Sequence, residues 1–161
     1  MDSSDVGGRY VPISVRTALG GILVIALVGA GVAGCSGDGT PKAEVLLSEF
    51  VVEPDPTSED AGEIEFVGDN QGSETHEFVV VRADSADALP TDADGAVVED
   101  ELEEGALIGE IEDIESGDSK SVTLDLEAGR YVLFCNITEV AESGEVESHF
   151  AEGMHAGFEV N

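Results

Sequence analysis

The chain has very few basic side chains: 6 lysine and arginine residues stand against 36 aspartate and glutamate residues, for a formal net charge of −30 over 161 residues. Nucleic-acid binders neutralise phosphates with lysine and arginine, so this deficit excludes nucleic acid as a partner. Only one long apolar run is present, which excludes a protein that spans a membrane several times. Because 42% of the residues are hydrophobic and are interleaved with the acidic ones, we expect one folded domain and not a disordered chain.

The single apolar run, residues 18–34, follows Arg9 and Arg16 and ends in Val-Ala-Gly-Cys35. Its length of about 17 residues lies near the lower limit for a membrane-spanning helix and close to that of a secretory signal core. The ending resembles the lipobox of bacterial-type lipoprotein signal peptides, in which the chain is cut before the cysteine and the thiol receives a diacylglycerol. The resemblance implies a signal peptide over 1–34, a lipidated Cys35, a tether over 35–42 and a domain over 43–161.

The alternative is an uncleaved signal anchor in which Cys35 has no role. Both interpretations keep the two arginines on the cytoplasmic side. We therefore expect an extracytoplasmic domain, anchored to the outer face of the cytoplasmic membrane by lipid or by an N-terminal helix.

Beyond the tether, short segments rich in β-branched residues alternate with Gly, Pro, Asn and Asp, and none shows a sustained helical period. Val122, Leu124 and Leu126 alternate with polar residues, as in a strand with one buried face. About seven short strands predict an all-β, two-sheet sandwich. The expected strands cover residues 44–52, 63–67, 77–82, 107–114, 121–126, 130–136 and 156–160.

An acidic stretch, residues 83–106, separates the third and fourth expected strands. We interpret it as a surface excursion with one helical turn near residues 99–104. Its aspartates lack the spacing and the closing glutamate of an EF-hand loop, so a calcium site is not favoured.

Histidine, cysteine and methionine are scarce, with 3, 2 and 2 residues, yet four of them fall in a suggestive chain order. His76 begins an expected strand, Cys135 ends another, and His149 and Met154 follow before the last strand. One thiolate and two imidazoles hold copper in a trigonal arrangement, with a thioether as a weak axial ligand. Zinc binds the same thiolate and imidazoles but rarely a thioether, so Met154 favours one copper ion. With Cys35 lipidated, the domain has no second thiol for Cys135 to pair with, and metal ligation explains why it remains free.

These residues lie in segments that resemble the cupredoxins, the small blue (type 1) copper proteins that include plastocyanin-like and halocyanin-like carriers. The resemblance spans about residues 44–161 and is most specific at Asn70-x-Gly72 with His76-Glu-Phe, at residues 128–136 and at residues 149–154. It implies a Greek-key β-sandwich with His76, Cys135, His149 and Met154 as copper ligands. It also implies an electron carrier and not an enzyme, with redox proteins as donor and acceptor.

One departure from the family stands between Cys135 and His149, where residues 136–148 replace the usual two to four. We expect an acidic insertion after Ile137 that loops out while its two ends stay close, since extra loop length adds only about 0.6 kcal/mol of closure entropy per doubling. Because of this insertion, two other functions stay open. One is a copper chaperone or copper-handling lipoprotein that uses the same ligands, and the other is a copper-free cupredoxin-like binding module.

Several residues beside the ligands have expected supporting roles. Asn70 and Asn136 are placed to hydrogen-bond the ligand loops or the thiolate, and such bonds tune a metal site. Gly153 is placed to form the turn before Met154. Phe150 is expected in the core or in the wall of the site, with an exposed docking patch as the alternative, and His155 at the surface.

Overall fold

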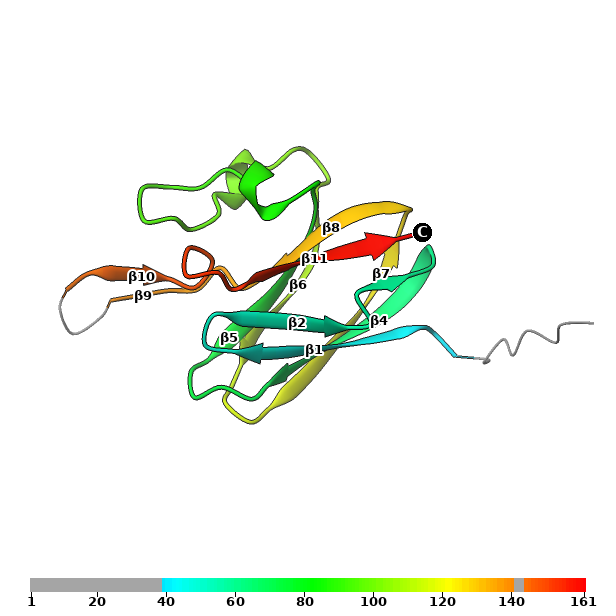
Figure 1. The fold of residues 1–161 in the computed structure, drawn as a ribbon, viewed down its shortest axis with the longest axis horizontal. Coiled ribbons are helices and arrows are strands. Elements are labelled where there is room, and N and C mark those ends of the chain that lie inside the picture. Colours follow the sequence, from blue (N-terminus) through cyan, green and yellow to red (C-terminus); the bar gives the residue numbers. More distant parts are fainter. Residues whose placement is uncertain (1–38, 141–143) are drawn as a thin grey trace, which may run out of the picture. The chain divides into compact units, whose positions relative to one another are not determined.

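Two β-sheets face each other in the computed structural model, which describes residues 39–140 and 144–161 (Figure 1). The first sheet contains, in spatial order, β2 (Val51–Asp55), β1 (Lys42–Ser48), β4 (Gly62–Asn70) and β7 (Ser119–Leu126). The second contains β3 (Ser58–Glu59), β11 (His155–Val160), β8 (Gly129–Phe134), β5 (His76–Arg82) and β6 (Leu107–Ile114). The expected all-β, two-sheet sandwich is confirmed.

Six of the seven expected strands agree with the structure to within three residues at each end. The exception is residues 44–52, which form two antiparallel strands, β1 and β2, joined by a turn at Glu49 and Phe50. Phe50 has a φ of 60°, a left-handed conformation that bulky residues seldom adopt. The turn was missed because it contains no glycine, proline or asparagine, and apolar residues stand on both sides of it.

The strand pairing is mixed, with β1 parallel to β4 and β3 parallel to β11, while the other pairs within the two sheets are antiparallel. In the second sheet β8 lies between β11 and β5 and is antiparallel to both. The carboxyl end of β8 therefore lies beside the amino ends of β5 and β11. This arrangement brings three distant parts of the sequence to one end of the sandwich.

The main core fills the space between the sheets and includes Phe66 of β4 and Phe78 of β5, whose ring centroids are 5.6 Å apart. A second apolar cluster lies on the other face of β5 and β8, where Leu89 and Val97 of the acidic excursion are buried. Because both faces of these two strands are covered, the residues of β5 from Phe78 to Val81 are all buried and show no alternation. The excursion is therefore a cover for the sheet as well as a surface loop.

The excursion itself contains two short 3₁₀ helices, η1 (Ala86–Ala88) and η2 (Glu99–Glu101), the second within the expected helical turn. Between them, the Asp92 carboxylate accepts hydrogen bonds from the backbone N–H groups of Asp94 and Ala96. Such local bonds are typical of aspartate in turns, so the position of the Asp92 carboxylate does not require a metal ion.

The residues of the expected signal segment and tether up to residue 38, including Cys35, lie outside the described part of the chain. Within residues 39–140 and 144–161, no helix is long and apolar enough to cross a bilayer.

Candidate metal centre

The strand arrangement places the four expected ligands at one end of the sandwich. His76 is the first residue of β5, Cys135 directly follows β8, and Met154 directly precedes β11. His149 lies between the hairpin described below and Met154. All four side chains are buried, with relative exposures of 0%.

The insertion between Cys135 and His149 forms an antiparallel hairpin of β9 (Thr138–Val140) and β10 (Val146–Ser148), seen at the far edge of the fold in Figure 1. Its base is closed by a hydrogen bond of 3.0 Å from the His149 N–H to the Ile137 carbonyl. The expectation that the insertion loops out while its ends stay close is confirmed. The hairpin lengthens the loop without separating the two ligands that flank it.

A tight turn connects His149 to Met154. The Met154 N–H donates to the His149 carbonyl over 2.9 Å, and the Cys135 N–H donates to the Met154 carbonyl over 3.1 Å. Gly153 has a φ of 104°, which a residue with a Cβ rarely adopts, so the expected turn role of this glycine is confirmed. These backbone bonds tie three of the four expected ligands together.

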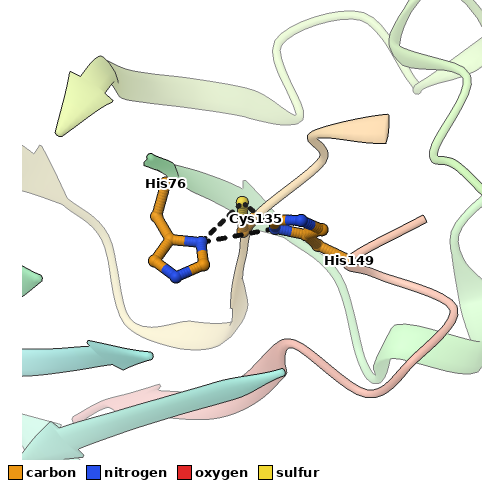
Figure 2. Close-up of side chains that lie close together, drawn as sticks. All are labelled: His76, Cys135 and His149. Atoms are coloured by element: carbon orange, nitrogen blue, oxygen red, sulfur yellow. Dashed lines mark hydrogen bonds between the residues drawn. The ribbon is translucent and has the colours of Figure 1, made fainter. Parts of the chain in front are cut away.

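Three donor atoms converge at the centre of the site (Figure 2). The Nδ1 atoms of His76 and His149 are 3.3 Å apart, and the Cys135 Sγ atom lies 3.9 Å from the first and 3.4 Å from the second. With bond lengths of about 2.0–2.1 Å to nitrogen and about 2.3 Å to sulfur, three donors at trigonal angles around one ion would stand roughly 3.5–3.8 Å apart. The observed triangle fits one metal ion.

Burial dominates the proton affinities in the site. It raises the pKa of the Cys135 thiol to about 11, against weaker opposing effects of the N–H groups of Glu77 and Ile137. It also lowers the pKa of His76, and the neighbouring His149 lowers it further. Without a metal the centre therefore holds a neutral thiol and a neutral His76 at neutral pH, and a cation must displace the thiol proton to bind.

Asn70 holds the loop that leads into His76. Its side chain is fully buried and donates hydrogen bonds of 2.7 Å to the carbonyls of Glu74 and Ile114. Its Oδ1 atom accepts a bond of 2.9 Å from the Gly72 N–H. The expected role of Asn70 in a ligand loop is confirmed, because three bonds from one side chain fix residues 71–75.

Glu49 holds the same loop from the β1–β2 turn. Its carboxylate accepts bonds from the Ser73 N–H and hydroxyl and from the Glu74 N–H. A Cβ on Gly72 would stand 2.9 Å from both carboxylate oxygens, so a side chain there would displace the Glu49 carboxylate from its present position. Bonds from the backbone of Glu49 itself, from Ser73 and from Glu74 lower the pKa of Glu49 to about 2.

We expect Glu49→Gln to loosen residues 71–75 and to remove one component of acid stability. The pKa of Glu49 is lower in the folded state than its ordinary value of 4.5, so its stabilising effect is complete above about pH 4.5 and is lost as the pH falls toward 2. Amide hydrogen exchange at Ser73 and Glu74 should be faster in the variant at pH 6. Glu53→Gln, at an exposed position of β2, is the control, and equal exchange rates in the two variants would contradict the role of Glu49.

Asn136 connects the site to the acidic excursion and not to the thiol. Its side chain exchanges hydrogen bonds with the backbone of Val97 and donates to Glu99, and its N–H donates to the Glu77 carboxylate. The Sγ atom of Cys135 receives the Glu77 N–H at 3.4 Å. The expectation that the Asn136 side chain bonds a ligand loop or the thiolate is therefore wrong, because its amide points toward residues 97–99.

The other side chains near the site either belong to an apolar cluster or pack against a ring of the site. Phe150 is 7% exposed and packs edge-on against Phe134, so it belongs to the second apolar cluster and offers no exposed patch. His155 is partly buried beside Phe150. Phe50 packs edge-on against the His149 ring at 5.7 Å.

Sequence reasoning missed Glu49, Phe50, Glu74 and Glu139 as residues of the site. Three of them are acidic and resemble the other acidic residues of the chain. No local pattern distinguishes them, because their contacts with the site depend on the tertiary fold.

Comparisons with protein-family models and with curated protein sequences find no match. Solved structures do match. An auracyanin from the photosynthetic bacterium Roseiflexus castenholzii has 20% identity and a TM-score of 0.50, over 78% of this chain and 99% of that chain. Auracyanin B has 20% identity and a TM-score of 0.52, over 77% and 92%. An azurin from Methylomonas sp. strain J has 14% identity and a TM-score of 0.51, over 76% and 99%. These likenesses confirm the expected fold: the described part of the chain has the cupredoxin fold.

Proposed function

We propose that this protein is a type 1 copper protein that carries single electrons, with His76, Cys135, His149 and Met154 as the ligands of one copper ion. The observation that supports this most directly is the buried triangle of two imidazole nitrogens and one thiol on a cupredoxin fold. Met154, fully buried and bonded through its backbone to both Cys135 and His149, supplies the thioether. A bound copper ion would supply a one-electron Cu(I)/Cu(II) couple.

The chain's own contribution is rigidity and exclusion of water. The ligands are attached to two strands of one sheet and to a turn closed by backbone hydrogen bonds, so we expect their positions to change little between the redox states of a bound copper ion. Complete burial of the donors keeps water away from the ion. The proposed activity is therefore the exchange of one electron, without transformation of a substrate.

Copper loading tests this proposal. Protein lacking residues 1–34, titrated with Cu(II), should bind one ion per chain and develop an intense visible absorption from the thiolate. Ascorbate should bleach the band, and reoxidation should restore it. A protein that stays colourless after loading would falsify the proposal and favour the copper-free binding module.

Full burial of the donors also bears on the copper-handling alternative. A chaperone passes its ion on by ligand exchange, which requires at least one accessible donor, whereas His76, Cys135 and His149 are each 0% exposed. Slow transfer of copper to a chelator, together with fast electron exchange, is expected of a carrier. The reverse pattern would favour the chaperone.

The proposed partners are redox proteins with a positively charged docking face. The described residues include four basic side chains, and each has a carboxylate or carbonyl partner: Lys42 with Glu44, Arg82 with Glu127, Arg130 with Asp84, and Lys120 with the backbone of residues 112–113. The remaining surface charge is acidic, and such a field accelerates association with a basic partner at low ionic strength. Export and attachment to the outer face of the cytoplasmic membrane through Cys35 belong to the same proposal and depend on the N-terminal sequence.

A further inference from the structure

The outer nitrogen of His149 is buried and faces the carboxylate of Glu74. The ring is 0% exposed, and its Nε2 atom is 3.6 Å from the Oε2 atom of Glu74. Both atoms are buried and have no hydrogen-bond partner within the described part of the chain. Buried polar atoms without a partner cost roughly 1–3 kcal/mol each, so two that face each other indicate a contact with a role.

The inserted hairpin brings a second carboxylate to the same place. Glu139 lies on β9, and ligand atoms of Glu74, Glu139 and His149 all lie within 4.8 Å of one another. Glu74 belongs to the loop that Asn70 and Glu49 hold. The two acidic residues thus come from two different segments that meet beside His149, and the Phe50 ring packs against the His149 ring.

The protonation of a metal-bound imidazole explains the pairing. When Nδ1 of a neutral histidine holds a cation, the proton resides on Nε2, which then becomes a hydrogen-bond donor. Metal-bound histidines commonly donate this N–H to a carboxylate, which orients the ring and increases its basicity. A more basic ligand stabilises Cu(II) more than Cu(I), and so does a nearby negative charge.

We infer that Glu74 is a positioning residue for His149, that it accepts the Nε2–H bond when the ion is bound, and that Glu139 adds a second negative charge beside this pair. This inference rests on the proposed function. It assigns the inserted hairpin a role in tuning the copper ion, because the hairpin carries Glu139, one of the two carboxylates that lower the reduction potential of the ion.

The test is the midpoint potential of copper-loaded Glu74→Gln, which removes the charge and keeps the shape. A tenfold fall in the ratio of Cu(II) to Cu(I) affinity corresponds to about 59 mV for a one-electron couple, and we expect an upward shift of this order. Glu139→Gln should shift the potential in the same direction by less. Glu74→Asp, which keeps the charge on a shorter side chain, should recover part of the shift. Glu152→Gln is the matched control, since it removes an exposed carboxylate from the loop between His149 and Met154.

A second measurement reports on the bond itself. In the diamagnetic Cu(I) protein, the His149 Nε2–H proton should exchange slowly with water and give an NMR signal, and exchange should be faster in Glu74→Gln. Unchanged unfolding of the metal-free variant would show that the fold is intact.

Three outcomes would overturn the inference. A shift in Glu74→Gln no larger than that in Glu152→Gln would overturn it alone, with the copper site still established. Two bound ions in the unchanged protein and one in Glu74→Gln would show that the carboxylates hold a second cation. A protein that binds no copper would overturn the proposed function and this inference together.

Discussion

Replacing Cys135 by serine should abolish the visible copper band and weaken Cu(II) binding by more than about 100-fold, since loss of an outer partner of a ligand alone costs 10–100-fold. The thiol is the only sulfur donor of the buried triangle, and a serine hydroxyl at the same place stays protonated. Copper uptake by the unchanged protein should release a proton, because burial raises the pKa of this thiol to about 11. Isothermal titration in two buffers of different ionisation enthalpy measures this proton.

Thermal unfolding provides the control for this variant. Free copper at 1,000 times its dissociation constant stabilises the folded state by about 4.1 kcal/mol, and the same concentration should stabilise a variant with 100-fold weaker binding by only about 1.4 kcal/mol. Without metal, Cys135→Ser should unfold close to the unchanged protein, because the N–H groups that face the sulfur can bond the hydroxyl. A variant that keeps the copper-dependent stabilisation would rule out Cys135 as a ligand.

Asn70→Ala should destabilise the metal-free domain by about 3 kcal/mol, since a lost buried hydrogen bond costs roughly 1 kcal/mol or more when its partner is left unpaired. The substitution removes three bonds at once and leaves the backbone groups of Gly72, Glu74 and Ile114 without their partner. A change of this size should lower the melting temperature by on the order of 12 °C for a domain of this length. Copper affinity should fall as well, because the loop leads directly into His76.

Gln71→Ala is the matched control for Asn70→Ala. Gln71 is the next residue and is exposed, and its side chain donates to the Asp69 carboxylate, while its backbone bond to the Leu47 carbonyl does not depend on the side chain. An exposed substitution of this kind usually changes stability by less than about 0.5 kcal/mol. Similar melting temperatures for the two variants would refute the role assigned to Asn70.

The strands were predictable where one face is buried and the other meets water. Residues 121–126 alternate in this way, and β7 includes all of them. The alternation of buried and exposed residues was less informative for β5. Its inner residues are buried on both faces, because the acidic excursion covers the outer face of the sheet. The alternation failed at Glu49 and Phe50, where a turn without glycine, proline or asparagine stands between two apolar segments.

The chain order of the ligands was also readable, because histidine, cysteine and methionine are rare in this protein and their chemistry suits one metal. The distances between the ligand side chains could not be predicted from the sequence. His76 and Cys135 are 59 residues apart in the chain, and only the antiparallel pairing of β5 and β8 brings them together. The low cost of extra loop length allowed the two ends of the insertion to stay close, and the bond from His149 to Ile137 holds them together.

From sequence alone, the scarcity of basic residues argued against nucleic acid as a partner, and the scarcity of sulfur and imidazole pointed to the ligands. The roles of the abundant acidic residues were decided by tertiary structure alone. Glu49, Glu74 and Glu139 differ from the other carboxylates only in the donors and rings that the fold places around them. Rare residues are informative in the sequence because few alternatives exist for each, whereas common residues acquire a role only through their contacts in three dimensions.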